Sequence, residues 1–128
     1  MKRSINSKCP CGSGKKYKKC CRIFHKGAYP KDILSLMKSR YSAFAMQEID
    51  YIIKTSLYQN NKQELLEFSR NCEFKKLEII EVKDNFVIFK AFIECGGVDN
   101  SFCEKSYFKK VDGKWKYERG EFLGDELI

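Results

Sequence analysis

The stretch FKKVDGKWKY, residues 108–117, decides the fold because it sets how two strands pair. At its centre, Asp112-Gly113 is a dipeptide that accepts positive φ at both positions of a two-residue turn. The flanking runs are rich in β-branched and aromatic residues, which favour strands. A two-residue turn places Val111 opposite Lys114. We therefore predict an antiparallel hairpin centred on this turn.

The register of this hairpin determines which side chains share one face of the sheet. It pairs Phe108 with Tyr117 and Ser106 with Arg119, because paired residues stay equidistant from the turn. Glu104 lies on the same face, diagonal to Arg119. If this face points into the fold, the charged side chains of Glu104 and Arg119 lie among aromatic side chains. The predicted face carries Phe102, Glu104, Ser106, Phe108, Trp115, Tyr117 and Arg119.

Working outward from the hairpin, the chain divides into helical and extended parts. Strands are predicted at residues 77–82, 86–93, 102–111 and 115–121. Before them, apolar residues recur at spacings of three and four, which is typical of amphipathic helices. We predict helices that begin near Pro30, near Ile49 and after a capping Asn61. Three helices followed by an antiparallel sheet predict an α+β fold in which the helices cover one face.

The N-terminal residues carry most of the charge. The net charge is +8 over 128 residues, yet residues 1–30 hold nine lysines and arginines and no acidic residue. Because the composition changes near Gly27, we predict a basic head of residues 1–27 and a body of residues 28–128. No apolar run approaches the roughly 18 residues of a membrane span, and no secretion signal is recognisable, so we expect a cytoplasmic protein.

The head contains the sequence CPCGSGKKYKKCC, residues 9–21, in which two cysteine pairs are separated by eight residues. Four thiolates are a preferred ligand set for structural zinc. Gly12 and Gly14 allow a sharp turn that directs backbone N–H groups toward sulfur. A segment of about 25 residues cannot bury a core, so metal binding would supply its folding free energy. The predicted ligands of one structural zinc ion are Cys9, Cys11, Cys20 and Cys21.

Other interpretations of the cysteines stay open at this point. The four could be reduced thiols without a metal, or His25, the only histidine, could replace one of them. A redox pair is disfavoured because no Cys-x-x-Cys arrangement is present, and a phosphate loop is disfavoured because Lys16 stands where Ser or Thr is needed. A disulfide scaffold is disfavoured by the odd cysteine count. We expect small core residues, not nucleophiles, at Cys72, Cys95 and Cys103.

The sequence of residues 9–21 resembles the SEC-C motif found at the C-terminus of the SecA translocation ATPase. In that protein the motif is a zinc-binding tail implicated in contacts with a chaperone and with ribosomes. The resemblance spans only about 15 residues, but its Cys-x-Cys-Gly-Ser-Gly and Cys-Cys elements are specific. It implies zinc binding by the head and contacts with a protein or with ribosomes.

The body is similar to a second family. The sequences LMKSRYSAF at residues 36–44, EKSYF at 104–108 and GKWKY at 113–117 resemble the YchJ-like family of uncharacterised bacterial proteins. This resemblance implies a SEC-C head joined to a cone-shaped α+β domain of the nuclear transport factor two-like, or SnoaL-like, type, which frequently dimerises through its sheet. Family members can carry a second SEC-C motif at the C-terminus, whereas this chain ends GDELI, so a function that needs two motifs is not expected.

The favoured functional hypothesis is a noncatalytic adaptor. Its basic head would bind an acidic protein or ribosomal RNA through charge and backbone contacts, with an aromatic ring available for stacking. A head whose charge only keeps the protein soluble is the alternative. The candidate partner-binding residues are Lys15, Lys16, Tyr17, Lys18, Lys19 and Arg22.

The second hypothesis is a small-ligand binding protein or an enzyme that uses a pocket in the body. The body contains no histidine, which disfavours a catalytic dyad or triad, although Glu104 could act as a carboxylate base. Glu104 paired with Arg40 or Arg119 would form either the polar floor of a ligand site or a buried ion pair that orders a helix against the sheet. The pocket candidates are Arg40, Tyr41, Glu104, Ser106, Tyr117 and Arg119.

Overall fold

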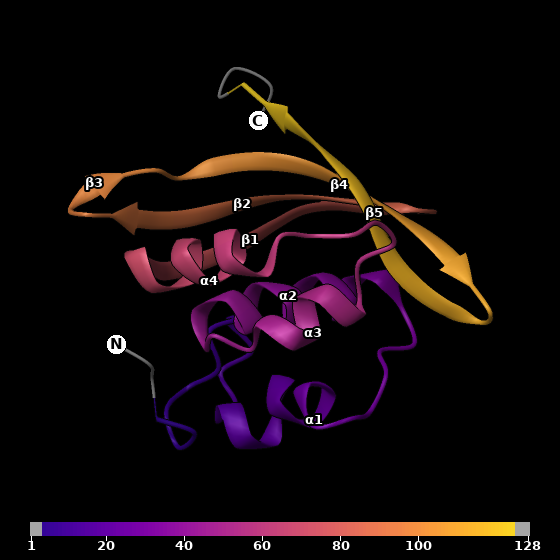
Figure 1. Cartoon of the computed structure of the whole chain (residues 1–128), viewed down its shortest axis with the longest axis horizontal. Coiled ribbons are helices and arrows are strands. Elements are labelled where there is room, and N and C mark those ends of the chain that lie inside the picture. The colour runs from indigo at the N-terminus through magenta and orange to yellow at the C-terminus, as the bar shows by residue number, and fades with distance from the viewer. Residues whose placement is uncertain (1–3, 125–128) are drawn as a thin grey trace.

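The computed structural model describes residues 4–124 and arranges them in three layers (Figure 1). An antiparallel sheet forms the first layer, three helices form the second, and the N-terminal head lies on the side of the helices away from the sheet. The predicted order of three helices and then strands is confirmed, and with it the α+β fold class. Within residues 4–124 no helix is long and apolar enough to cross a membrane.

The helices of the middle layer are defined by their caps. Their bounds are α2 (Ile33–Ala45), α3 (Ile49–Lys54) and α4 (Lys62–Asn71). The helix predicted from Pro30 begins later, because Asp32 is the N-cap and its side chain accepts the Ser35 N–H at 2.8 Å. The predicted cap at Asn61 is confirmed by the hydrogen bond that its side chain accepts from the Glu64 N–H at 3.0 Å. Each cap satisfies a backbone donor that would otherwise lack a partner.

The sheet contains the four predicted strands and one short addition. Its strands are β1 (Cys72–Lys83), β2 (Phe86–Cys95), β3 (Val98–Asp99), β4 (Phe102–Val111) and β5 (Lys114–Leu123). All pairs are antiparallel in the order β1-β2-β4-β5, and β3 pairs with β2. β4 has the predicted bounds, whereas the other three predicted strands extend beyond theirs, most of all β1, which begins directly where α4 ends.

A bulge in β5 changes the register predicted for the hairpin. Phe108 pairs with Tyr117 as predicted, but the next pair joins Tyr107 to Arg119. Glu118 is therefore an extra residue in β5 with no partner of its own in β4. Bulges of this kind shift all later residues of a strand by one position relative to the partner strand.

The bulge reverses the predicted orientation of one candidate site residue. Ser106 pairs with Gly120 instead of Arg119, so the predicted Ser106–Arg119 pair was wrong. Arg119 lies on the outer face, with its guanidinium carbon 4.0 Å from the centre of the Tyr107 ring and Nη1 3.3 Å from Glu121 Oε1. The assignment of Arg119 to an inward-facing pocket is therefore wrong as well.

The two ends of the first hairpin are joined covalently. Cys72, the first residue of β1, lies opposite Cys95, the last residue of β2, and the two form a disulfide. Both are half-buried and pack against the main core, but the sequence analysis did not foresee their bond, because pairing of β1 with β2 brings them together from 23 residues apart. Cys103 is a buried residue of β4, as expected.

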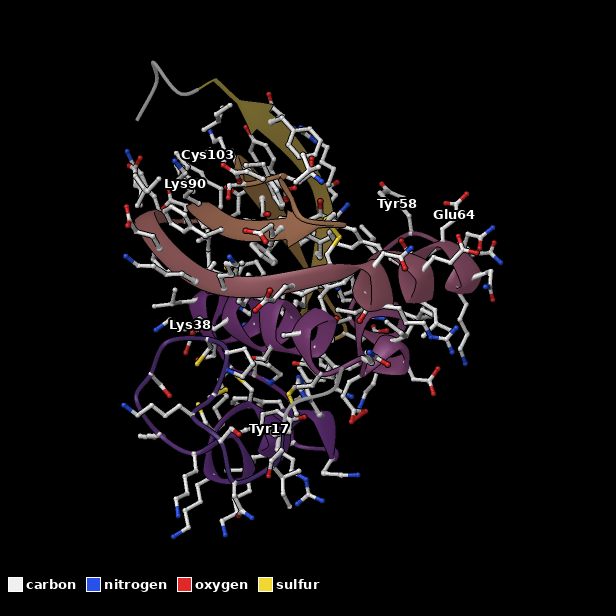
Figure 2. All side chains as sticks on the ribbon, turned by 90° about the vertical axis from the view of Figure 1, so that its left-hand side faces the viewer. Tyr17, Lys38, Tyr58, Glu64, Lys90 and Cys103 are labelled. Carbon is white, nitrogen blue, oxygen red and sulfur yellow. A yellow bond between two sulfur atoms is a disulfide. The ribbon has the colours of Figure 1, made fainter. Side chains whose placement is uncertain are left out.

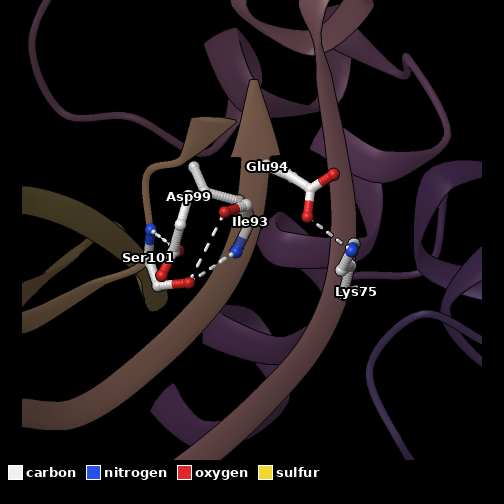
Figure 3. Close-up of polar contacts among 5 residues, drawn as sticks. All are labelled: Lys75, Ile93, Glu94, Asp99 and Ser101. Carbon is white, nitrogen blue, oxygen red and sulfur yellow. Dashed lines mark hydrogen bonds and ion pairs between the residues drawn. The ribbon is translucent and has the colours of Figure 1, made fainter. Parts of the chain in front are cut away.

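Polar contacts fix the connection between β2 and β4 (Figure 3). The Ser101 hydroxyl accepts the Ile93 N–H at 3.2 Å, and the Asp99 carboxylate accepts the Ser101 N–H at 2.9 Å. On the neighbouring strand, Lys75 Nζ lies 2.7 Å from Glu94 Oε2. These contacts hold the end of β2, whose Ile93 side chain belongs to the core.

The main core lies between α2 and the inner face of the sheet. Trp115, on the sheet face that the sequence analysis singled out, is half-buried and packs against this cluster. The buried cluster consists of Ile33, Leu36, Met37, Tyr41, Phe74, Leu77, Val87, Phe89, Ala91, Ile93 and Phe108.

Candidate metal centre and cavity

Two of the four head cysteines lie on a small ribbon. Residues 7–9 run antiparallel to residues 15–17, and the Cys9 N–H donates to the Lys15 carbonyl at 2.8 Å. The chain reverses between these segments, where Gly12 and Gly14 have φ of +85° and +84°. Residues with a Cβ rarely adopt such φ values, so the glycines provide the sharp turn that the sequence predicted.

The other two cysteines lie where two short helices meet, neither of which was predicted. The single turn η1 (Tyr17–Lys19) leads directly into α1 (Cys21–His25). Cys20 is the residue between them, and Cys21 is the first residue of α1. The ribbon and the helix junction therefore present their cysteines to a common centre.

The four thiols form a cluster that fits one metal ion. All four Sγ atoms lie within 4.8 Å of one another, and those of Cys11 and Cys20 are 3.6 Å apart. Tetrahedral coordination with Zn–S bonds of about 2.3 Å separates the sulfurs by about 3.8 Å, which matches this spacing. The hydroxyls of Ser42 and Ser13 lie 3.4 Å from the sulfur of Cys9 and 3.2 Å from that of Cys20, where they can donate hydrogen bonds to ligand sulfurs.

The electrostatics of the cluster also favour a cation at its centre. Hydrogen bonds from the Cys11 and Cys21 thiols, and from Ser42, lower the pKa of Cys9 despite its burial. Contacts with Cys11 and Cys9, together with burial, raise the pKa of Cys21. Neighbouring thiols cannot all ionise at neutral pH because their negative charges repel each other. A metal ion removes this conflict, since it holds every coordinating thiol as thiolate.

The head is completed by residues of the body. Met46, which follows α2, is fully buried and packs among Cys9, Cys11, Cys21 and Tyr17. The head is too short to bury a core of its own, and the methionine supplies apolar contacts that such a core would otherwise make.

A chain of hydrogen bonds crosses from the head into the helical layer. His25 Nδ1 lies 2.6 Å from the Tyr17 hydroxyl, and Nε2 lies 2.8 Å from the Ser39 carbonyl oxygen. Since a carbonyl only accepts, Nε2 carries the proton and Nδ1 accepts from Tyr17. The Ser39 hydroxyl continues the chain to Tyr51 at 2.7 Å. His25 thus connects the two parts of the molecule and lies outside the sulfur cluster.

The position of Tyr17 corrects one sequence-based prediction. Its side chain was expected to stack on a partner, but only 2% of the residue is exposed. Figure 2 shows Tyr17 within the head. The ring is buried because it packs beside the cysteines and donates its hydroxyl proton to His25. The prediction that Tyr17 contacts a partner was therefore wrong.

The half-buried imidazole of His25 predicts a loss of stability in mild acid. Burial lowers the pKa of His25 below its ordinary value of 6.5, against the opposing effects of the Ser39 carbonyl and the Glu48 carboxylate. Below about pH 6.5, His25 becomes protonated in the unfolded chain but stays neutral in the folded chain, where its pKa is lower. The free energy of unfolding therefore falls by up to about 1.4 kcal/mol for each unit by which the pH is lowered. Denaturant unfolding at several pH values measures this slope.

The pH experiment needs a reference, because acid also protonates metal-binding thiols. Other titratable groups that act on His25 are Tyr17, Cys9, Glu48 and Lys26. A His25→Gln variant keeps these groups and removes the imidazole. The difference in slope between wild type and variant isolates the histidine, and equal slopes would contradict the prediction.

The surface of the head is strongly cationic. Six lysines there are exposed and Arg22 is half-buried, and none of the seven takes part in an ion pair within residues 4–124. Figure 2 shows nitrogen-tipped side chains that extend from the head away from the sheet. The lysines are Lys8, Lys15, Lys16, Lys18, Lys19 and Lys26.

A separate cavity lies on the inner side of the sheet. Its volume is about 710 Å³, in the range of pockets that enclose small molecules. Aromatic and aliphatic side chains of α2, α4, β2, β4 and β5 form most of its wall. Five of the six predicted pocket residues line it, and Arg119 does not. The five are Arg40, Tyr41, Glu104, Ser106 and Tyr117.

Arg40 reaches the cavity from α2 as a buried cation. Its Nη1 donates to the Ile52 carbonyl at 3.1 Å, to Thr55 Oγ1 at 2.7 Å and to Ser56 Oγ at 3.1 Å. The guanidinium carbon lies 4.4 Å from the centre of the Tyr117 ring. Burial lowers the pKa of Arg40 to about 10, so it stays protonated at neutral pH.

Glu104 supplies a carboxylate at the same end of the cavity. Its Oε2 accepts hydrogen bonds from the Ser106 hydroxyl and, at 3.3 Å, from the Tyr117 hydroxyl. Within residues 4–124 it forms no ion pair with Arg40 or Arg119, so the interpretation as a buried ion pair is not supported.

Gly120 is the site residue whose role the sequence analysis missed. A Cβ at this position would collide with the Glu104 carboxylate and lie 2.7 Å from the Tyr117 hydroxyl. A glycine here therefore leaves the space that the carboxylate occupies. The sequence did contain one indication of this role, because Gly120 is a lone glycine inside a predicted strand. Such glycines often mark a bulge or a place where another group comes close to the backbone.

Comparisons with known proteins agree with this architecture. Residues 6–22 match the SEC-C motif, and residues 32–120 match the family described as YchJ, middle NTF2-like domain. The molecule is thus an NTF2-like domain with a SEC-C head. The chain belongs to the YchJ-like family.

Relatives and a solved structure extend over nearly the whole chain. A UPF0225 protein of Corynebacterium efficiens is 37% identical over 94% of this chain and 98% of its own length. A UPF0225 protein of Vibrio vulnificus is 34% identical over 92% of this chain and 77% of its own. The solution structure of a SEC-C motif containing protein from Rhodopseudomonas palustris matches with a TM-score of 0.77 and 30% identity, covering 91% of this chain and 98% of that one.

Proposed function

We propose that the protein is a noncatalytic adaptor in which a zinc ion holds the head and the head binds an acidic partner. Zinc is the metal assigned to the site because four thiolates in a closed tetrahedral cluster are its usual structural ligand set. The same closure leaves no open coordination position for catalysis. The metal would therefore be structural.

The observation that carries the adaptor role is the set of head cations that form no ion pair within the described residues, 4–124. A bound zinc ion would fix the segment that bears Lys15, Lys16, Lys18 and Lys19, and residues 1–30 contain no acidic residue. Fixed positive charge attracts polyanions and speeds their association. Ribosomal RNA or an acidic protein surface would complement it.

Charge removal tests this proposal better than deletion of the head. Deleting residues 1–26 would expose Met46 and remove the His25 contacts, which would damage the body as well. In the substituted chain Lys15, Lys16, Lys18 and Lys19 become glutamine. Cosedimentation with ribosomes at low salt should weaken by roughly a hundredfold if these lysines contact phosphates, and the salt dependence should become shallower.

A matched variant separates head binding from net charge. Substituting Lys109, Lys110, Lys114 and Lys116 by glutamine removes the same charge from the β4–β5 hairpin, which lies away from the head (Figure 1). Binding should persist in this variant. Equal losses in both variants, or no loss in the head variant, would contradict the adaptor proposal. Binding that survives ribonuclease treatment of the ribosomes would identify an acidic protein as the partner.

The cavity favours a second function, the binding of a small molecule. An apolar space of about 710 Å³ with a few polar groups at one end is the usual form of a ligand site. The test uses naphthylpropanamide, which has an apolar body and a polar end. Chemical-shift changes in the NMR spectrum at cavity residues such as Ala91 and Phe108 would support this function. No change at millimolar concentration would contradict it.

A further inference from the structure

The polar groups of the cavity define what kind of molecule it would accept. Most of the wall is apolar. Within residues 4–124 one cation, Arg40, and one carboxylate, Glu104, line it, and both contact Tyr117. Arg40 lies over the face of the tyrosine ring, whereas Glu104 accepts from its hydroxyl. The two charges are therefore close to each other without forming an ion pair.

Two nitrogen atoms of the Arg40 guanidinium, Nε and Nη2, are available to donate hydrogen bonds to a ligand. All its hydrogen bonds come from Nη1, so Nε and Nη2 make none within residues 4–124. No buried side-chain nitrogen or oxygen in this part of the chain lacks a partner. Nε and Nη2, which have no such partner among the described residues, must therefore be accessible. Since Arg40 lines the cavity, we take the cavity as the space from which they can be reached. A guanidinium in such a place donates to an acceptor on the ligand.

Glu104 has an acceptor to spare. Both of its hydrogen bonds end on Oε2, from Ser106 and from Tyr117. Oε1 accepts no hydrogen bond from any other group in residues 4–124, so it can accept one from a ligand donor. Gly120 keeps the carboxylate in this position because it has no Cβ.

We propose that the cavity binds a net-neutral apolar molecule whose polar end carries both a hydrogen-bond acceptor and a donor, as in a carboxamide. The acceptor takes a hydrogen bond from Arg40, and the donor gives one to Glu104. A carboxylate would suit Arg40 but would be repelled by Glu104, and an ammonium group would meet the opposite conflict. The inference rests on the proposed small-molecule function of the cavity.

Three probes with the same apolar body test the choice of polar end. They are naphthylpropanamide, naphthylpropanoate and naphthylpropylamine, titrated into the intact zinc-loaded protein by calorimetry. Wild type should bind the amide roughly tenfold more tightly than either charged probe, because each charged probe faces one like charge across a short distance of low polarity.

Glu104→Gln removes the negative charge and keeps an oxygen for Ser106 and Tyr117. The variant should bind the carboxylate roughly tenfold more tightly than wild type does, and the amine roughly tenfold more weakly. Glu94→Gln is the matched control, since it removes the same charge from an exposed pair with Lys75 outside the cavity. In the control the order of the three probes should not change.

Gly120→Ala provides an independent variant that adds and removes no charge. The new methyl group would push the Glu104 carboxylate from its position beside Tyr117. Amide affinity should fall, whereas the carboxylate should lose less. This variant keeps the inference testable if Glu104→Gln disturbs folding.

The outcomes separate the inference from the function on which it rests. If wild type binds none of the three probes, both fail. If it binds the carboxylate or the amine most tightly, the cavity is a ligand site but the proposed ligand class is wrong. The inference also fails if Glu104→Gln and Glu94→Gln change the three affinities equally.

Discussion

A Cys21→Ser variant is expected to lose the metal and the folded structure of the head. Cys21 is the first residue of α1, is only 2% exposed, and contributes one of the four clustered sulfurs. A serine hydroxyl is a poor replacement for thiolate at a soft metal. Because structural zinc contributes on the order of 10 to 16 kcal/mol to the folding of such modules, even partial loss of the site should unfold the head.

Metal analysis and hydrogen exchange measure this result. Wild type should hold one zinc ion per chain, and Cys21→Ser close to none. Amides of residues 9–25 should then exchange rapidly, whereas those of β2 and β4 stay protected. Cys103→Ala, which changes a buried cysteine outside the cluster, should keep the metal. A wild-type protein without metal, or a variant that retains it, would show that the cluster is not a zinc site.

His25→Ala is expected to have the second largest effect, a loss of roughly 2 to 4 kcal/mol in the free energy of unfolding. The substitution leaves the buried Tyr17 hydroxyl and the Ser39 carbonyl without the partner that His25 gives each of them. It also removes the contact of the imidazole with Tyr51, whose ring centre lies 4.7 Å away. The head would then be held against the helical layer by Met46, by the packing of Phe24 and by the contact of Cys9 with Ser42.

Denaturant unfolding in excess zinc measures the loss, since saturating metal keeps the cluster intact. Ile23→Ala on the same helix is the matched control, because this side chain is 51% exposed and its truncation should change stability by no more than about 0.5 kcal/mol. A cost for His25→Ala no greater than that of the control would mean that the hydrogen-bonded chain does not join head and body.

The sequence predicted those features that depend on neighbouring residues. The clustering of the four cysteines follows from a short segment in which two glycines permit the turn. The Asn61 cap and the Asp112-Gly113 turn are equally local, and both were predicted correctly. Glu104 and Ser106 could be named because side chains alternate along any strand, and Tyr117 because the turn sets its pairing with Phe108. Arg40 and Tyr41 could be named because they lie on the first predicted helix of the body.

The features that were missed depend on contacts between distant segments. The bulge at Glu118 interrupts the alternation that the turn established, and Gly120 is the one nearby sequence feature that points to it without fixing its position. Cys72 and Cys95 meet only when β1 pairs with β2. Tyr17 lies in a run of lysines and looked exposed, yet a body methionine and His25 enclose it. In each case tertiary packing outweighs the local pattern.

The bulge has a consequence for insertions and deletions in this strand. The residues of β5 that follow the bulge lie on the same faces of the sheet as they would if Glu118 were absent. Gly120 therefore points inward and Arg119 outward. Loss of that single residue would leave both orientations unchanged. Loss of one residue between Arg119 and Phe122 would instead move every later side chain of β5 to the opposite face of the sheet, because side chains alternate along a strand. Length variation among relatives should therefore be tolerated at position 118 and selected against two residues later, where Gly120 leaves room for the carboxylate.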